Sequence, residues 1–532
     1  MGDANGSLGA HPEKKGRYSA LPLRELVRVR GKTARPCSFW ARAFGISITI
    51  VLLALGAAVC FIMWGTETFD NSLLENLILR NNTQMFEWWK RPPVTPYIQV
   101  RLFNYTNWQA VMDKREIPLV KEVGPYTFLQ ETEKTAVVFN DNSTVTYREH
   151  TTFVFQPQRS VGFEDDIVAL PNVPFLSAVS VLRDSNFMKQ MAMSMALNSV
   201  NPPPFLRFSS QEFLWGYKET LTQLAKAFSV VNIDPESLKL GILEARAGVT
   251  RNAVTVETGA RDVDRLGLIV DVGGSDRLDA WGGTDCSRVD GSDGSMFPPR
   301  LVQERQRLYI FTKDMCRRLA LDFNTTTTLN GIETYKYMPP MNVFGTPEQN
   351  PENECFCPPS ENPDEPSCPY GGVFSVGPCN FGAPVLVSFP HFYGGDEELY
   401  HFVNGLNPDP SKHSMYLYIH PIIGVPMGGK TRFQMNVKVR KSSKISSIDF
   451  LEEGAVLPVA WIEIGVDELP EEVIALLHKA SMTKHVKSVL LYGSITVIFV
   501  TSIILLWCAY RCWTRRETIR NISQDSHILE PL

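Results

Sequence analysis

The stretch Phe44–Trp64, FGISITIVLLALGAAVCFIMW, contains 21 residues and no charge. A second uncharged run, VLLYGSITVIFVTSIILLWCAY, occupies Val489–Tyr510 near the other end of the 532-residue chain. About 20 apolar residues let a helix cross the hydrocarbon core of a bilayer. The two runs therefore predict two transmembrane helices. The alternative is a pair of buried core helices, but uninterrupted runs above about 18 apolar residues are rare in soluble folds.

Flanking charge predicts how the chain is oriented. Residues 1–43 carry nine Lys or Arg against three acidic residues, a net charge of +6. Positive charge stays on the cytoplasmic side, so the N-terminus is predicted to be cytoplasmic. Two spans then place residues 511–532, with a net charge of +1, on the same side. The predicted order is a cytoplasmic tail (1–43), a helix (44–64), an extracellular or lumenal ectodomain (65–488), a helix (489–510) and a cytoplasmic tail (511–532).

The charge of the ectodomain follows from this division. The whole chain has a net charge of −5, so residues 65–488 carry −12. An acidic chain of this kind argues against binding to nucleic acid, for which a basic domain is usual.

Cysteines agree with the predicted topology. The ectodomain contains six of them: Cys286, Cys316, Cys355, Cys357, Cys368 and Cys379. An even number in an oxidising compartment favours three disulfides, with 15 connectivities open. A zinc site is the alternative, but the local pattern is C-x-C without a histidine at finger spacing. At the inner face, Cys37, Cys508 and Cys512 are candidates for palmitoylation, or are unmodified thiols.

Glycosylation sequons add a second test of topology. Asn81, Asn104, Asn142 and Asn324 begin N-x-S/T motifs in the ectodomain, and all four are predicted to carry glycans. Asn5 and Asn521 fit the same pattern in the tails and are predicted to carry none.

The ectodomain reads as mainly strands with helical insertions. Alternation predicts strands over 97–105, 415–420, 431–440 and 456–464, and a hairpin over 135–155 with its turn at Asp141-Asn142. Helical spacing is predicted over 70–90, 174–200, 211–228 and 468–486.

One motif has the form of a phosphate-binding loop. Gly424–Thr431, GVPMGGKT, matches G-x-x-x-x-G-K-[ST], which needs a helix directly after it. The following residues, RFQMNVKVR, alternate as a strand, so a hairpin turn is the better interpretation. Neither a G-x-S-x-G nor an H-E-x-x-H motif occurs. We therefore predict no enzyme, cofactor or metal site.

The segment Phe187–Leu197, FMKQMAMSMAL, has a methionine-rich helical face. Met188, Met191 and Met195 are spaced i, i+3 and i+7 and share that face. Methionine suits surfaces that accept varied apolar ligands. The alternative is that these side chains pack on the core, which is the commoner fate of an apolar face.

Seven motifs in order resemble a known family. They are VGPYTF (123–128), FLWGY (213–217), DGSMFPP (293–299), CFC (355–357), FPHFY (389–393), GLNPD (405–409) and IHPIIGVPM (419–427). Each is weak alone, but together they resemble the class B scavenger receptors, the family of fatty-acid translocase and lysosomal integral membrane protein type 2. The likeness extends over nearly the whole region between the two apolar runs.

The resemblance implies an α+β membrane protein with one large ectodomain. It implies an antiparallel β-barrel-like core, an apical helical bundle and an apolar tunnel toward the membrane. It also implies the pairing Cys286–Cys355, Cys316–Cys379 and Cys357–Cys368. It places ligand binding on the apical helices, where the candidate residues are Phe187, Met188, Lys189, Met191, Met195, Arg207 and Lys218.

The implied function is that of a receptor at the plasma membrane. Its partners would be lipoprotein or lipid-carrier particles, apoptotic cells or microbes, with transfer of fatty acid, sterol or carotenoid to the membrane and no bond chemistry. A homo-oligomer is compatible with this reading. The apical loop Asn201–Phe208 has Arg207 as its one cation, which argues against strong binding of polyanions. The alternative function is an endosomal or lysosomal sorting receptor for a soluble protein, although Asp525 is one residue too close to Ile528-Leu529 for the usual dileucine signal.

Overall fold

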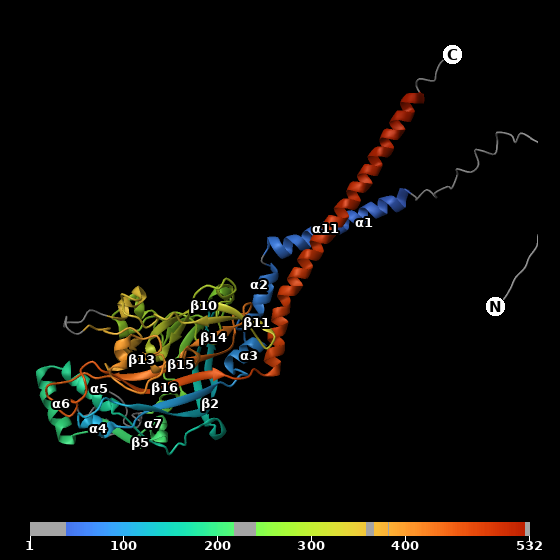
Figure 1. Cartoon of the computed structure of the whole chain (residues 1–532). Coiled ribbons are helices and arrows are strands. Elements are labelled where there is room, and N and C mark those ends of the chain that lie inside the picture. The colour runs from blue at the N-terminus through green and yellow to red at the C-terminus, as the bar shows by residue number, and fades with distance from the viewer. Residues whose placement is uncertain (1–38, 67, 218–240, 358–365, 381, 527–532) are drawn as a thin grey trace, which may run out of the picture. The chain divides into compact units, whose positions relative to one another are not determined.

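The computed structural model describes residues 39–66, 68–217, 241–357, 366–380 and 382–526. Its contacts divide the chain into two units, which we describe separately: Met1–Thr66 with Val489–Leu532, and Glu67–Ser488. Cys37 and Lys218 lie outside the described residues. The first unit holds two apolar helices from the two ends of the chain, and the second is a large β-rich ectodomain (Figure 1).

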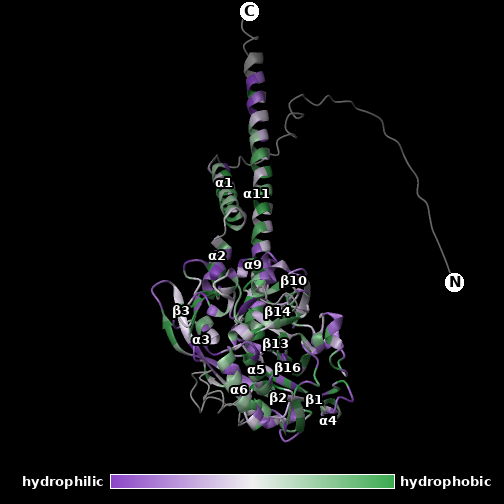
Figure 2. Ribbon diagram, turned by 90° about the vertical axis from the view of Figure 1, so that its left-hand side faces the viewer, coloured by the Kyte–Doolittle hydropathy of each residue, from purple (hydrophilic) through white to green (hydrophobic). Residues whose placement is uncertain are grey.

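The apolar helices are α1 (Phe39–Cys60), which continues as a π-helix over Phe61–Gly65, and α11 (Glu471–Ser526). Both are long and apolar enough to cross a membrane. Figure 2 shows hydrophobic residues along α1 and the middle of α11, with hydrophilic residues toward the C-terminal end of α11. Only 6% and 11% of their most apolar windows are buried, so the alternative of two soluble core helices is wrong.

The ectodomain is built on one 14-stranded sheet, in which β8-β7-β3-β2-β1-β16-β15-β14-β11-β10-β9 is the main order. The paired strands are antiparallel. The strands are β1 (Tyr97–Tyr105), β2 (Val120–Phe139), β3 (Thr144–Phe155), β6 (Gly248–Val249), β7 (Val254–Glu257), β8 (Ile269–Val272), β9 (Leu308–Thr312), β10 (Arg317–Leu329), β11 (Ile332–Met338), β12 (Val373–Ser375), β13 (Val385–Ser388), β14 (Tyr416–Ile419), β15 (Pro426–Lys438) and β16 (Val456–Val466).

A short segment around Ser292 links the two ends of this sheet. Ser292 forms a bridge with Leu268, beside β8, and another with Ile310 in β9. Gly291 has a φ of +107°, and a Cβ there would lie 3.0 Å from the Tyr309 carbonyl oxygen, so a glycine suits this close approach. The sheet is therefore a nearly closed barrel, which removes most of its free edge.

Helices cover one end of the ectodomain. α5 (Val173–Arg183) and α6 (Phe187–Val200) pack on each other, and α7 (Ser210–Trp215) follows the small β4–β5 sheet (Ile167–Pro171 and Phe205–Ser209). Phe175, Leu176 and Val179 of α5 are buried in the same cluster as Val100 and Leu102 of β1. The other α-helices among the described residues are α2 (Thr68–Leu74), α3 (Gln84–Lys90), α4 (Trp108–Met112), α9 (Pro299–Gln303) and α10 (Pro410–His413).

Three predicted helices differ from the structure. The helix expected over 70–90 is broken between α2 and α3, since the Leu79 N–H donates to the Thr258 carbonyl and Thr83 caps α3. The helix expected over 174–200 is split at Asp184, because Asn186 accepts from the Lys189 N–H and begins α6. The helix expected over 211–228 ends at Trp215, and the remainder past Tyr217 lies outside the described residues.

Three disulfides join Cys286 to Cys355, Cys316 to Cys379 and Cys357 to Cys368. These are the pairs that the resemblance implies. Among the described residues the free thiols are Cys60, Cys508 and Cys512, all in the helical unit.

Candidate ligand-binding site

An apolar face on α6 is the main candidate for ligand binding. Met188 and Met195 are 76% and 67% exposed, and Phe187 and Met191 beside them are exposed as well. The opposite side of the helix carries Met193 and Leu197, which are buried against the core. The alternative that the Met188, Met191 and Met195 face packs on the core is therefore wrong.

Capping holds this helix in place. Asn186 accepts a hydrogen bond from the Lys189 N–H at 3.0 Å, and Asn201 ends the helix in the left-handed conformation. Lys444, from a distant segment, places its ammonium 5.9 Å from the centre of the Phe187 ring. Lys444 could not be predicted as part of this site, because no pattern near it in the sequence points to α6.

The candidate cations that the structure describes lie on different elements. Lys189 lies exposed on α6 with the methionines. Arg207 is exposed on β5, where it pairs with Ala169 of β4. Lys218 lies outside the described residues. The site is thus defined by apolar surface on α6 more than by charge.

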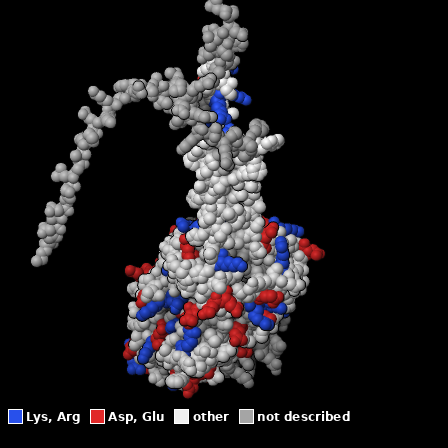
Figure 3. All heavy atoms as spheres, turned by 90° about the vertical axis from the view of Figure 1, so that its right-hand side faces the viewer, with Lys and Arg blue, Asp and Glu red and all other residues white. Residues whose placement is uncertain are grey.

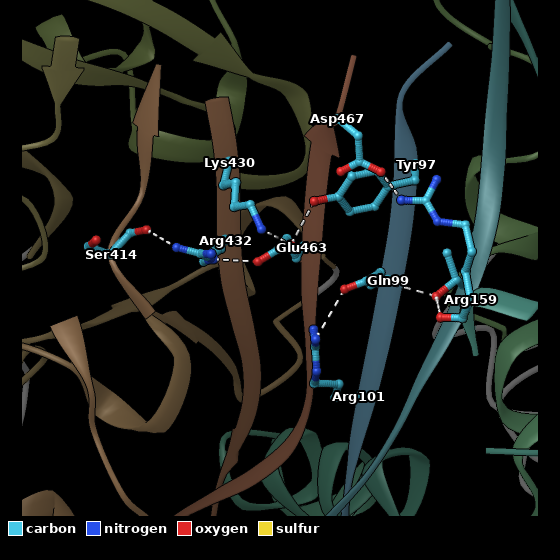
Figure 4. A network of polar contacts seen from close by, with 10 residues as sticks. Tyr97, Gln99, Arg101, Arg159, Ser414, Lys430, Arg432, Glu463 and Asp467 are labelled. Carbon is cyan, nitrogen blue, oxygen red and sulfur yellow. Dashed lines mark hydrogen bonds and ion pairs between the residues drawn. The ribbon is translucent and has the colours of Figure 1, made fainter. Parts of the chain in front are cut away.

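A second group of polar residues lies on one face of the central strands. Glu463 on β16 accepts hydrogen bonds from Tyr97 at 2.9 Å, Lys430 at 3.0 Å and the Arg432 Nε at 2.6 Å (Figure 4). Their side chains meet because Arg432 pairs with Glu463 in register and Tyr97 pairs with the neighbouring Gly465. The side chains of Glu463 and Arg432 are 5% and 4% exposed, so their ion pair is buried, whereas Lys430 is 34% exposed.

Lys430 therefore has a structural partner. β15 begins at Pro426 and runs through the motif that has the form of a phosphate-binding loop, with no helix after it. The antiparallel pairing of β14 with β15 confirms a hairpin, but β15 begins at Pro426, so the strand starts five residues earlier than predicted and Lys430 lies in it. A phosphate-binding loop needs a helix N-terminus, which this strand does not offer.

The cations set the ionisation of Glu463. Burial alone would raise the pKa of this carboxyl, but hydrogen bonds and charge from Lys430 and Arg432 hold it below its ordinary value of 4.5. Burial and the neighbouring Glu463 raise the pKa of the Tyr97 phenol well above 10.0. Glu463 is therefore a carboxylate anion surrounded by hydrogen-bond donors, an arrangement that fits a structural role better than a role in proton transfer.

A histidine pair adjoins the same face. The ring centres of His391 and His413 lie 4.4 Å apart, and the His391 Nε2 lies 2.9 Å from a Glu122 oxygen that also accepts from Trp461. The Nδ1 of His391 accepts from the Asn407 N–H at 3.1 Å, so the ring is held between this backbone group and Glu122. Within the described parts of the chain, no group of three or more His, Cys, Asp or Glu residues could hold a metal ion.

Surface charge is mixed in sign. Figure 3 shows acidic and basic side chains interspersed over one face of the ectodomain. Such a surface offers no large positive field to a polyanion.

Comparison with known proteins identifies the family of this chain. A family model described as the CD36 family matches residues 47–512. Scavenger receptor class B member 1 of Cricetulus griseus is 28% identical over 493 residues, 92% of this chain and 94% of the relative. Lysosome membrane protein 2 of Rattus norvegicus is 30% identical over 439 residues, 81% of this chain and 87% of the relative. The resemblance seen in the motifs is confirmed: the chain belongs to the CD36 family.

Proposed function

We propose that this protein is a class B scavenger receptor that binds lipid-bearing particles at the cell surface and passes apolar lipid to the membrane. The apolar face of α6 carries the proposal. Exposed apolar patches on soluble surfaces commonly mark sites of binding to proteins or lipids. Family membership adds support, since relatives bear the name of a scavenger receptor.

The proposed ligands are particles with an apolar or amphipathic surface. Met188, Met191 and Met195 are flexible and polarisable, so one face can adapt to lipoproteins, lipid carriers or apoptotic membranes. Lys189 and Arg207 are exposed and positively charged, so they would attract the phosphate groups of phospholipid headgroups. Strong binding of polyanions is not proposed, because the ectodomain carries −12.

After docking, fatty acid, sterol or carotenoid would move through an ectodomain tunnel to the bilayer. The driving force would be transfer between apolar surroundings, without cofactor or catalysis. Both termini would lie in the cytoplasm, consistent with the basic tail that precedes α1. Palmitoylation of Cys37, Cys508 and Cys512 fits this orientation.

The test is uptake of labelled lipid from lipoprotein by cells that express the chain. Surface display is confirmed by antibody on intact cells. Uptake above that of empty cells is expected for at least one of fatty acid, sterol or carotenoid. Uptake equal to empty cells for all three, at confirmed surface density, would reject the proposal.

A second candidate is a sorting receptor of endosomes or lysosomes for a soluble protein. The relative named lysosome membrane protein 2 supports it, at 30% identity. The two candidates differ in residence, because a sorting receptor would be found mainly on internal membranes at steady state. Quantitative immunofluorescence of intact against permeabilised cells separates them.

A further inference from the structure

Two stacked histidines bind the backbone of one surface segment, Gly405–Asp409, which lies outside every helix and strand. The Nδ1 of His391 accepts from the Asn407 N–H at 3.1 Å, and the Nδ1 of His413 accepts from the Asp409 N–H at 2.9 Å. The two rings lie 17° from parallel with their centres 4.4 Å apart, and both residues are buried. Two imidazole nitrogens are thus the acceptors for backbone groups of this segment.

The position of His391 is fixed from the other side by the central strands. Its Nε2 lies 2.9 Å from a Glu122 oxygen on β2, and its backbone N–H donates to the Gln434 side chain on β15 at 2.6 Å. The Phe103 ring of β1 meets the imidazole edge to face at 5.1 Å. His391 also has a φ of +54°, which is uncommon for a residue other than glycine. The ring therefore cannot turn away from Asn407 without breaking these contacts.

The elements packed against the pair contribute both signs of charge. The charged side chains are Arg101 of β1, Glu122 of β2, Arg432 of β15, and Asp409 and Lys412 at α10, while β16 contributes the uncharged Trp461. Arg101 lies 3.5 Å from Glu122, and Arg432 is paired with Glu463 at 2.6 Å. Burial alone would raise the pKa of Glu122, but hydrogen bonds with His391 and Trp461 hold it below its ordinary value of 4.5, so an anion faces His391.

A proton on either ring removes an acceptor. The imidazolium carries an N–H at both nitrogens, so its Nδ1 can no longer bind the backbone N–H in front of it. Glu122 stabilises a positive charge on His391, whereas burial and that charge lower the pKa of His413 to about 4. Two positive rings 4.4 Å apart also repel each other. Acid therefore weakens both attachments of the segment.

We propose that His391 and His413 form an acid-sensitive clasp, in which protonation of the pair releases the segment Gly405–Asp409 while the sheet stays folded. Buried histidines provide conformational switches of this kind in pH-sensing proteins. The clasp would change this surface when the protein passes from neutral to acidic surroundings. It goes beyond the proposed receptor function and does not depend on it.

The experiment is hydrogen–deuterium exchange with mass spectrometry on the full chain in phosphatidylcholine nanodiscs, from pH 6.5 down to pH 4. After correction for intrinsic rates, exchange of peptides that cover Gly405–Asp409 should rise at least about tenfold, since each unit of pKa difference between the released and the clasped ring contributes a factor of ten. Peptides of β1 and β16 should stay protected over the same range. Exchange of the segment that does not change with pH would overturn the clasp, and so would its opening only together with β1 and β16.

Substitutions show whether the two rings are responsible. His391→Asn combined with His413→Asn keeps an acceptor near each Nδ1 but cannot titrate, so the segment should stay protected at pH 4. The matched control His401→Asn, at an exposed histidine close by in the chain, should open as the unsubstituted protein does. Undiminished opening in the double variant contradicts the proposal. If that variant does not fold, His413→Asn alone decides, because the acid-induced rise at the Asp409 amide must then disappear.

Discussion

At the scale of single residues, Glu463 holds a buried charge among the central strands. One carboxylate holds Lys430 and Arg432, and both ion pairs lie among the central strands. A buried ion pair stabilises a fold little more than apolar side chains of the same size would. Removing one partner, however, leaves the other charge unpaired in a low-dielectric interior, which is costly.

We therefore expect Glu463→Gln to destabilise the ectodomain by about 3–5 kcal/mol. The amide still accepts a hydrogen bond, so the loss reports the missing charge. Urea unfolding followed by tryptophan fluorescence measures it. The control is Glu333→Gln, at an exposed carboxylate on β11, which should change stability by less than about 0.5 kcal/mol. Equal losses in the two variants would contradict the assignment.

Two buried histidines predict how the fold responds to acid. Burial lowers the pKa of His413 and of His420 from 6.5 to about 4. His420 is fully buried, and its Nδ1 accepts from the Ile422 N–H while its Nε2 lies 3.0 Å from the Ser481 hydroxyl. The unfolded chain takes up protons near pH 6.5 and the folded one only near pH 4, so stability is full above 6.5 and is lost as pH falls toward 4.

Thermal unfolding across that pH range tests this. His420→Asn keeps an acceptor close to the position of Nδ1 but cannot titrate. It should flatten the fall in melting temperature between pH 6.5 and 4. His401→Asn, at an exposed histidine, serves as the control. A slope in His420→Asn as steep as in the unsubstituted protein would show that His420 does not contribute.

At the scale of elements, the residues of α6 that stabilise the fold and those proposed to bind ligand lie on opposite sides of the helix. Its buried side, with Met193 and Leu197, belongs to the core, whereas Met188, Met191 and Met195 face outward. Substitutions on the outer face should therefore change binding without changing stability.

The triple variant Met188→Ser, Met191→Ser, Met195→Ser should reduce lipoprotein binding to expressing cells by at least about tenfold, since three apolar contacts are lost. Its melting temperature should stay within about 2 °C of the unsubstituted protein. Met341→Ser, at an exposed methionine outside α6, should bind normally. Normal binding by the triple variant would remove α6 from the proposed function.

The same elements show what sequence patterns can predict. Alternation in YIQVRLFNY predicts β1 at Tyr97–Tyr105, and the structure has those bounds. The pattern missed β4 and β5, whose five-residue strands are too short for a clear period. It also joined α5 to α6, because the apolar spacing continues across Asp184 and the Asn186 cap is a weaker local signal.

Sites that are built from segments distant in the sequence could not be predicted from local patterns. The spacing around Lys430 suggested a phosphate loop, yet its partner Glu463 is on another strand. Arg317 and Asn353 likewise meet only because the fold brings β10 against the segment Pro351–Phe356. The methionine spacing of α6 could be read from the sequence, because three residues on one helix share a face in any fold.

At the scale of the whole molecule, the charge of the chain is unevenly distributed about its two apolar runs. The 43 residues that precede the first apolar run carry +6, whereas residues 65–488 carry −12. Basic flanks stay in the cytoplasm, so the acidic β-rich unit should face outward or into a lumen, where disulfides persist. Three disulfides in that unit agree with such a compartment.

Glycan mapping tests this orientation, since glycosylation occurs only on the lumenal side. Asn81, Asn142 and Asn324 are exposed, so each should carry a glycan. Asn104 is half-buried in β1, and its side-chain oxygen accepts from the Ala169 N–H at 2.9 Å, so we expect much lower occupancy there. Asn521, near the end of α11, should carry none. Glycopeptide mass spectrometry measures all five sites in one sample, and Asn81→Gln should remove one glycan while leaving the others. Sugar on Asn521 would reverse the topology, whereas full occupancy of Asn104 would mean that β1 is glycosylated before it pairs with its neighbours.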